Sequence, residues 1–376
     1  MVEAPSLWFK TLSKALIDEG FIASKNDPCL FLHPTKKIII LVYVDDCLIF
    51  GKEMSVLNDI VKTLRSKHPL TDDDIGNDVY DYLGIEVTMN DGKITLFQTG
   101  LINKILETTG YNTLSTTVKT PAKEVPLDLD ANGKPFDGNY DYASVVGMCL
   151  YVVNTRPDIQ FAVHSCCRFV HSPHKSHDNA IKRLCRYLIA TKDKGLTFHT
   201  GEFPLQLQCY VDADFCGLHK YEEHYHPVSP KSRTGYVIFL GKSPISWCSK
   251  LQTETALSST ESEIVALSTC MRKILWIQRL IQDISFGFGV KVHDETLIKA
   301  TVHEDNQAAI SNANKTSINN RTRHIHTKYW HFREHLNQQT GIVIQYIKSA
   351  DNIGDLFTKG VSAEFFVPLC ELLMGW

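Results

Sequence analysis

The spacing of apolar residues predicts that the chain begins with an amphipathic helix and continues into a small β-sheet. Apolar residues recur every three to five positions between residues 7 and 20, and Gly20 ends the pattern, as at the C-terminus of a helix. Three short apolar runs then predict strands, at residues 29–32, 38–44 and 47–50. A second helix is expected over residues 56–64.

A hairpin and a helical region are predicted next. Two β-rich runs indicate the hairpin, at residues 82–89 and 93–98. Asp91-Gly92 lies between them and supplies the positive φ that a tight turn requires. Residues 113–141 contain few large apolar side chains and several Pro and Gly residues, which favours an ordered crossing segment or linker. Helical spacing returns over two stretches, 142–170 and 176–191.

From about residue 200, strands and helices alternate. The expected elements are a strand at 205–212, a hairpin at 234–240 and 245–249, a helix at 259–284, a strand at 297–304, helices at 307–313 and 325–337, a strand at 342–347 and a terminal helix at 352–373. Three strands, a helix and then alternating strands and helices predict a mixed sheet with helices against it. The fold class is therefore α+β or α/β.

Composition and charge narrow the classes of protein that fit. The 376 residues suffice for two or three domains. With 39 Lys and Arg against 42 Asp and Glu, the net charge of -3 does not attract a polyanion, so any nucleic-acid surface must be local. The longest apolar run is far shorter than the roughly 20 residues of a membrane span, and no signal peptide begins the chain. We therefore expect an intracellular protein without membrane contact.

An acidic pair, Asp45-Asp46, lies at a turn between two apolar strands. Such a turn displays two carboxylates at the end of a buried sheet. Mg²⁺ suits this position, because it prefers carboxylate oxygens and because nucleotidyl transfer uses a pair of metal ions about 4 Å apart. On spacing alone, however, an Asp-Asp turn is more often a solvated hairpin end.

Several motifs, taken in order, resemble the C-terminal part of the Pol polyprotein of copia-type long-terminal-repeat retrotransposons. The motifs that resemble the reverse-transcriptase palm are Trp8-Phe9 and residues 26–31, 43–51 and 82–86. The motifs that match the rest are residues 155–159, 240–241, 244–247, 257–263 and 355–359. The resemblance covers essentially the whole chain, and the motifs stand in the order of the family.

This resemblance implies three domains. They are a truncated reverse-transcriptase palm at 1–110, a linker with a helical thumb or connection at 111–199, and a ribonuclease H-like mixed five-stranded sheet flanked by helices at 200–376. In the family, the polymerase has another metal-binding Asp upstream of Trp8-Phe9, in the segment that also supplies the fingers. Because Asp45 and Asp46 then lack this partner, we expect no DNA synthesis by the chain as given.

Four acidic residues are implied as the ribonuclease H site: Asp212, Glu263, Asp305 and Asp355. In the family this set holds two Mg²⁺ ions, with Mn²⁺ as an alternative, and hydrolyses the RNA strand of an RNA–DNA hybrid to a 3′-hydroxyl and a 5′-phosphate. The implied partners are this hybrid and a template-primer, together with other Pol segments such as integrase. The implied location is the cytoplasm, in a virus-like particle, and also the nucleus.

Two of the four residues have a close competitor on helix or strand spacing. Glu263 lies in line with Leu267 on the apolar stripe of its helix, whereas Glu261 fits a capping box with Ser258. A capping box from Thr260 to Glu263 is the open alternative. Asp212 and Asp214 share one face of a strand, and we favour Asp212 because Asp214 falls where the strand is expected to end.

The other two residues compete with an immediate neighbour or near neighbour. Asp305 stands at the carboxyl end of a strand, where α/β sheets place ligand sites, and Glu304 is expected to point to the other face as a structural residue. Asp351 can cap the last helix, while Asp355 lies one turn inside it.

Basic residues suggest where a nucleic-acid backbone would lie. Candidates are Lys182, Arg183 and Arg186 on one helix, with Tyr187 beside them, and Arg321 and Arg323 in a polar loop. His324 or His326 could help to expel product, although a helix of solvated imidazoles that packs its aromatic residues is the better interpretation. Two functions stay open: a ribonuclease H-type enzyme with an incomplete polymerase domain, or an inactive relic that only binds nucleic acid.

Overall fold

The computed structural model describes residues 4–67, 79–200, 205–222, 226–288, 298–315, 323–336 and 341–376. The chain forms two compact units. The first combines residues 1–77, 272–299 and 338–341, and the second combines residues 78–271, 300–337 and 342–376. These units do not coincide with the expected division at residues 110 and 199, so that division stays a prediction.

The first unit is built on a four-stranded antiparallel sheet in the order β1-β2-β3-β4. Its elements are α1 (Ala4–Asp18), β1 (Ile22–Ala23), β2 (Leu30–His33), β3 (Ile38–Tyr43), β4 (Asp46–Gly51) and α2 (Met54–Lys67). The second half of helix α7 (Ser259–Phe288) also belongs to this unit.

Both faces of this sheet are apolar, because successive side chains of a strand point to opposite sides. Phe31, Ile38 and Ile40 belong to a core that includes Leu16 of α1 and Ile60 of α2. The residues that alternate with them form a second cluster with α7, namely Leu30, Leu32, Ile39, Leu280, Ile284 and Phe288.

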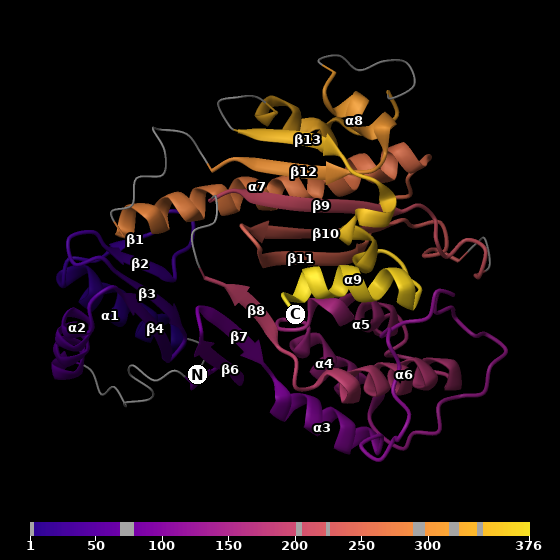
Figure 1. Cartoon of the computed structure of the whole chain (residues 1–376), viewed down its shortest axis with the longest axis horizontal. Coiled ribbons are helices and arrows are strands. Elements are labelled where there is room, and N and C mark those ends of the chain that lie inside the picture. Colours follow the sequence, from indigo (N-terminus) through magenta and orange to yellow (C-terminus); the bar gives the residue numbers. More distant parts are fainter. Residues whose placement is uncertain are drawn as a thin grey trace. The chain divides into compact units, whose positions relative to one another are not determined.

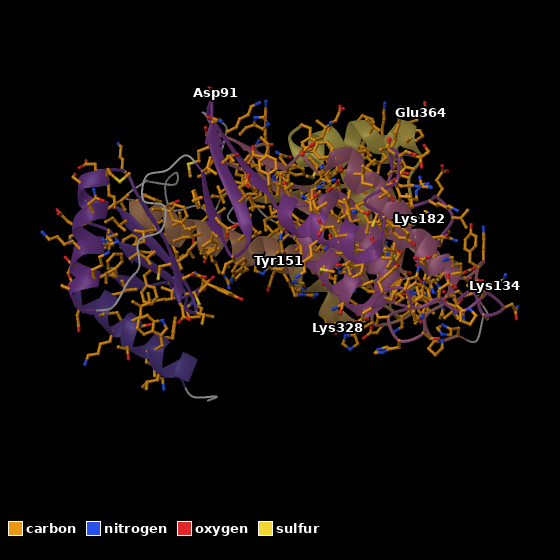
Figure 2. The ribbon with its side chains drawn as sticks, turned by 90° about the horizontal axis from the view of Figure 1, so that it is seen from below. Asp91, Lys134, Tyr151, Lys182, Lys328 and Glu364 are labelled. Atoms are coloured by element: carbon orange, nitrogen blue, oxygen red, sulfur yellow. The ribbon has the colours of Figure 1, made fainter. Side chains whose placement is uncertain are left out.

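The second unit contains two sheets, of which the smaller is antiparallel with the order β5-β6-β7-β8. Its strands are β5 (Val79–Tyr82), β6 (Ile85–Asn90), β7 (Lys93–Phe97) and β8 (Leu196–His199). Asp91 lies at the tip of the β6–β7 hairpin, as Figure 2 shows, and has a φ of 48°. Apolar spacing does not predict β8, which pairs with β7 from about a hundred residues further along the chain.

Several helices form an extensive core with the C-terminal helix. They are α3 (Thr99–Thr109), α4 (Tyr142–Val152), η1 (Pro157–Ile159), α5 (Gln160–Cys167) and α6 (Lys175–Thr191). Within the described residues, no helix or strand lies between α3 and α4, as the Pro-rich and Gly-rich composition predicts. Helix α3 is not among the elements predicted from the sequence.

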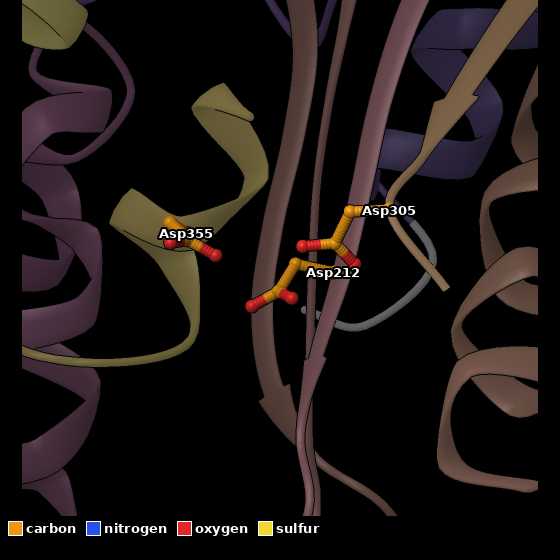
Figure 3. A group of neighbouring side chains, drawn as sticks. All are labelled: Asp212, Asp305 and Asp355. Carbon is orange, nitrogen blue, oxygen red and sulfur yellow. The ribbon is translucent and has the colours of Figure 1, made fainter. Parts of the chain in front are cut away.

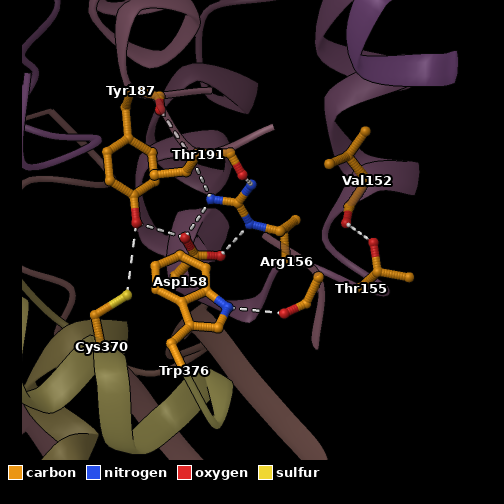
Figure 4. Close-up of polar contacts among 9 residues, drawn as sticks. Val152, Thr155, Arg156, Asp158, Tyr187, Thr191, Cys370 and Trp376 are labelled. Carbon is orange, nitrogen blue, oxygen red and sulfur yellow. Dashed lines mark hydrogen bonds and ion pairs between the residues drawn. The ribbon is translucent and has the colours of Figure 1, made fainter. Parts of the chain in front are cut away.

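A buried ion pair connects this helical core to helix α9 (Ala363–Met374). The Arg156 guanidinium donates to both carboxylate oxygens of Asp158, at 2.9 and 2.7 Å, and to the carbonyl of Thr191 at 3.0 Å. The Tyr187 hydroxyl donates to Asp158 and lies 3.5 Å from Cys370 Sγ of α9 (Figure 4). Because these partners satisfy a fully buried charge, removal of one would strongly destabilise the core.

The larger sheet has five strands in the order β11-β10-β9-β12-β13 (Figure 1). They are β9 (Leu207–Asp214), β10 (Arg233–Leu240), β11 (Ser243–Leu251), β12 (Ala300–Glu304) and β13 (Ile342–Tyr346). The first three pair antiparallel, and β12 pairs parallel to β9 and β13. The predicted fold class, mixed α and β with a mixed five-stranded sheet, is therefore confirmed.

Apart from α9, the helices that follow β12 in the chain are short. They are α8 (Gln307–Ala313), η2 (Thr327–His335), η3 (Ser349–Asp351) and η4 (Ile353–Phe357). The single terminal helix expected over residues 352–373 is wrong, because the chain forms η4 and α9 with a break at Gly360. A Cβ atom on Gly360 would lie 1.8 Å from the carbonyl oxygen of Lys123, so this close backbone contact requires glycine. Within the described part of the chain, none of the helices combines the length and apolar character needed to cross a bilayer.

Candidate metal centre

Asp212 lies near the end of β9, the central strand of the five-stranded sheet, and its side chain is buried. It pairs with Gly235 of β10. A Cβ atom on Gly235 would lie 2.6 Å from Thr358 Cγ2 and 2.8 Å from Phe357 Cβ, so glycine is what lets this segment approach the sheet. The Thr358 hydroxyl donates a hydrogen bond to Asp212 Oδ2 across this contact.

Asp355 reaches the cluster from η4, which Asn352 anchors to the sheet. The Asn352 amide donates to the carbonyl of Val211 at 2.8 Å, and its Oδ1 accepts from the Gly354 N–H at 3.0 Å. Gly354 lies against β9, because its Cβ would be 3.0 Å from the carbonyl carbon of Val211. Figure 3 shows the result, with the Asp355 carboxylate turned toward Asp212.

Asp305 and Glu304 stand at the end of β12, which is parallel to β9 and so brings its carboxyl end to the same region. Asp305 Oδ2 accepts from the Ser349 hydroxyl at 2.6 Å. Glu304 is fully buried, and its carboxylate accepts from the Asn306 N–H at 3.0 Å. The expectation that Glu304 points away was wrong. The strand ends at Glu304, so the alternation of side chains does not extend to Asp305.

Glu263 reaches the cluster from α7. Its side chain is buried on the same stripe as Leu267. Glu261 has a different role, since its carboxylate accepts from the Leu257 N–H at 2.7 Å while its own N–H donates to Ser258 Oγ at 3.1 Å. These bonds cap the first turn of α7, as the S-x-x-E spacing predicts.

Two overlapping groups of carboxylates result from this arrangement. Asp212, Asp305 and Asp355 each offer an oxygen within 4.8 Å of the others (Figure 3), and so do Glu263, Glu304 and Asp305. The structure therefore brings the four carboxylates chosen from the sequence into one cluster, in which Asp305 is shared. Glu304 is a further member, for which the strand pattern predicted only a structural role.

Burial and neighbouring carboxylates raise the pKa values of several side chains in the cluster. Burial, followed by Glu304 and Asp212, raises the pKa of Glu263 well above its ordinary value, and burial also raises that of Glu304. Burial and the neighbouring Asp212 raise the pKa of Asp355 to about 7. One ammonium group offsets part of this charge, since Lys359 Nζ lies 2.9 Å from Asp355 Oδ1 and 3.9 Å from Asp212 Oδ2.

These donors fit hard divalent cations. Both groups consist of carboxylate oxygens, which Mg²⁺ and Mn²⁺ prefer. The Oε2 atoms of Glu263 and Glu304 are buried without a hydrogen-bond partner among the described residues. Buried carboxylates of this kind require a proton or a cation. The two overlapping groups share Asp305.

Two acidic competitors stand apart from these groups. Asp214 belongs to neither of them, although burial and the nearby Asp212 raise its pKa. Asp351 is exposed at the end of η3. We expected Asp351 to cap the helix of Asp355, but Asn352 caps η4 instead, because its side chain accepts from the Gly354 N–H.

The candidate histidines lie outside both groups. His324 Nε2 lies 3.4 Å from Glu261 Oε2, and its side chain is exposed. His326 Nδ1 accepts from the Lys328 N–H at 3.1 Å at the start of η2. His326 therefore acts as a helix cap, and Tyr329, Trp330 and Phe332 of η2 are buried.

Asp45 and Asp46 are exposed at the β3–β4 turn of the first unit. Val44 in this turn has a φ of 52°, which is strained for a β-branched residue. The Trp8 indole N–H donates to the Val44 carbonyl at 3.0 Å and so supports the turn. In the described residues, neither Asp belongs to a group of three metal donors.

The predicted phosphate-binding residues of α6 are half-buried: Lys182, Arg183 and Arg186. Lys182, labelled in Figure 2, has its Nζ 5.4 Å from the centre of the Tyr111 ring. Arg183 donates to Thr120 Oγ1 at 2.6 Å. Tyr187 is buried and cannot offer its ring to a base. Arg323 is exposed, and Arg321 lies outside the described residues.

Comparison with known proteins places the chain among retroelement proteins. Residues 1–124 match the family described as reverse transcriptase (RNA-dependent DNA polymerase). The Retrovirus-related Pol polyprotein from transposon RE1 of Arabidopsis thaliana is 30% identical over 366 residues, which cover 97% of this chain and 24% of that protein. The corresponding polyprotein from transposon TNT 1-94 of Nicotiana tabacum is 30% identical, with coverage of 99% and 27%. The chain thus spans about a quarter of these relatives.

A shorter relative and two solved structures complete the comparison. The uncharacterized mitochondrial protein AtMg00810 of Arabidopsis thaliana is 31% identical over 241 residues, which cover 63% of this chain and 93% of that protein. LC11-RNase H1, isolated from compost by a metagenomic approach, aligns with a TM-score of 0.30 at 13% identity, over 41% of this chain and 93% of its own. The same enzyme in complex with an RNA/DNA hybrid aligns with a TM-score of 0.26 at 14% identity, with coverage of 41% and 94%.

Proposed function

The chain belongs to the family of copia-type retrotransposon Pol polyproteins, and from this premise we propose that its carboxylate cluster is a ribonuclease H-type active site. The proposed reaction is the metal-dependent hydrolysis of the RNA strand of RNA–DNA hybrids. One observation carries the proposal: Asp212, Glu263, Asp305 and Asp355, which are far apart in sequence, meet at one end of the five-stranded sheet.

In this site the protein would bind and orient the cations. Asp212, Asp305 and Asp355 would hold one ion, and Glu263 with Asp305 would hold the other. When bound, the two Mg²⁺ ions supply a more acidic water and stabilise charge on the phosphate. Hydrogen bonds from Thr358 to Asp212 and from Ser349 to Asp305 fix the orientation of two of the carboxylates.

Substrate binding is proposed to depend on local positive charge and on the ribose. Contacts with 2′-hydroxyl groups would distinguish the RNA strand from DNA. Lys182, Arg183 and Arg186 of α6, with Arg321 and Arg323, are the proposed contacts to the backbone of the hybrid. The match of residues 1–124 to reverse transcriptases adds a template-primer as a second proposed ligand. Binding to other Pol segments such as integrase, and a location in cytoplasmic particles and the nucleus, are part of the same proposal.

A cleavage assay on a labelled RNA–DNA hybrid tests this function. We expect cleavage with Mg²⁺, none with chelator, and a loss of about a hundredfold or more in Asp305→Asn, because that change removes the shared ligand. Asp351→Asn is the matched control, since Asp351 is exposed and belongs to neither group. Hybrid binding without cleavage in any sample would instead identify a relic that only binds nucleic acid.

A further inference from the structure

We propose that Glu304 is a fifth carboxylate ligand of the metal centre, which holds one cation together with Glu263 and Asp305. This inference rests on the proposed function, because it adds a ligand to the same site. It concerns a residue whose sequence pattern indicates only a structural role.

The position of Glu304 follows from the pattern of β12. The strand is buried at alternate positions, and Glu304 shares the buried side with Ala300 and Val302. An acidic residue at such a position is unusual, because burial of a carboxylate without compensation is strongly unfavourable. Its charge must therefore be balanced within the core.

The hydrogen bonds of this pair of glutamates are incomplete. Glu304 Oε1 accepts from the Asn306 N–H at 3.0 Å, whereas Oε2 is buried without a hydrogen-bond partner in the described structure. Glu263 Oε2 is in the same condition. Both side chains are more than nine-tenths buried. Two buried oxygens that lack donors thus belong to neighbouring carboxylates.

The ion pairs of the nearby ammonium group belong to the other half of the cluster. Lys359 forms its ion pairs with Asp355 and Asp212, which belong to the other group. Among the described residues, no Lys or Arg forms an ion pair with Glu263 or Glu304. The pair therefore needs either a shared proton or a bound cation.

The geometry suits the cation. Glu263, Glu304 and Asp305 each offer an oxygen within 4.8 Å of the others. Mg²⁺ binds oxygens at 2.0–2.1 Å, so ligands on opposite sides of the ion are about 4 Å apart. A cation bound among these three carboxylates would supply the positive charge that the two buried glutamates lack, and Asp305 would be a ligand in both groups.

The substitution Glu304→Gln tests whether a bound cation or a shared proton balances the two glutamates. The amide Oε1 can still accept from the Asn306 N–H, while the negative charge is lost. We expect isothermal titration with Mn²⁺ and with Mg²⁺ to show one ion bound about tenfold more weakly or worse. We also expect the metal-free variant to melt at the same temperature as the wild type or higher, because the amide has the shape of the carboxyl group, carries no charge and keeps the bond from the Asn306 N–H. A merely damaged fold would lower that melting temperature.

Glu261→Gln is the matched control. Glu261 is a buried glutamate on the same helix as Glu263, and it belongs to neither donor group. Its amide oxygen could keep the bond from the Leu257 N–H. We expect this variant to bind both ions as the wild type does.

The outcomes distinguish this inference from the function on which it rests. A wild-type protein that binds no divalent ion and cleaves no hybrid would reject both. If the wild type binds the ions and cleaves the hybrid while the ion affinities of Glu304→Gln are unchanged, Glu304 is not a metal ligand. A proton shared with Glu263 then accounts for the buried pair. If Glu304→Gln does not fold, Glu304→Asp replaces it, with the same reading of weakened or unchanged binding.

Discussion

The two acidic sites of this chain differ in how their carboxylates are brought together. Asp45 and Asp46 are adjacent in sequence and exposed at one turn of the first unit. The carboxylates of the metal centre come from β9, α7, β12 and η4, and most of them are buried. Two neighbouring residues need only a hairpin, whereas the second cluster needs a complete tertiary structure. Among the described residues, adjacency in sequence gives Asp45 and Asp46 no third metal donor, whereas the tertiary structure gives the second cluster two groups of three.

The largest expected effect is a contrast in nuclease activity between the two sites. Asp212→Asn should reduce Mg²⁺-dependent cleavage of a hybrid by about a hundredfold or more, because it removes a ligand. The double variant Asp45→Asn with Asp46→Asn should cleave at the wild-type rate. Equal losses in both proteins, measured in parallel by gel assay, would contradict the separation of the two sites.

Next in size is the effect of a methyl group at the contact between β10 and the segment after η4. Gly235→Ala should destabilise the protein by about 1–3 kcal/mol, since the new Cβ would clash with Thr358 and Phe357. Gly147→Ala is the control, because its Cβ meets no atom within 4 Å and alanine favours a helix by about 0.5–1 kcal/mol. Urea unfolding measures both, and a neutral Gly235→Ala would show that this contact yields easily.

The free energy of unfolding of the metal-free protein should depend on pH, with an effect of similar or smaller size. The pKa of Asp355 is about 7, through burial and Asp212, which is above the value of about 4 in an unfolded chain. The folded state thus binds more protons than the unfolded state between these values, and the free energy of unfolding falls as the pH rises through this window. Stability at pH 8 should be about 1–3 kcal/mol below that at pH 5.

Saturating Mg²⁺ should remove most of this difference, and Asp355→Asn should reduce it. Urea unfolding at the two pH values, with and without the ion, provides the measurement. A metal-free protein that is more stable at pH 8 than at pH 5 would show that other groups dominate.

The smallest effect is expected at the exposed turn. Val44→Gly should stabilise the first unit by about 0.5–1 kcal/mol, because glycine adopts the positive φ of this position without strain. Val343→Gly, at an exposed strand position where φ is not positive, should be destabilising instead. Chemical denaturation followed by tryptophan fluorescence compares them. A destabilised Val44→Gly would show that the side chain contributes more than the strain removes.

Local spacing predicted most elements well, because their apolar residues repeat within a few positions. The helix of Glu263 and the hairpin at Asp91-Gly92 are examples. It failed where a distant part of the chain decides the structure. Strand β8 has four residues and depends on pairing with β7, and the break at Gly360 depends on contact with Lys123.

The candidate site was predictable from the sequence only in part. The sequence predicts Asp305 at the carboxyl end of a strand, and the parallel pairing of β12 with β9 brings that end toward Asp212. The contribution of Glu304 was not predictable, since it depends on the strand ending one residue before Asp305. The position of Asp355 depends on glycine contacts between η4 and the sheet, and no local pattern shows which strand a short helix will contact.

The attachment of η4 to β9 also has a consequence for synthesis on the ribosome. The Asp212 carboxylate accepts a hydrogen bond from Thr358, which is 146 residues further along the chain. The Asp355 carboxylate and the Lys359 ammonium group belong to the same late segment. All five strands are complete by Tyr346, before any of these groups emerges. A nascent or prematurely terminated chain can thus contain every strand of the sheet and still lack the complete carboxylate cluster.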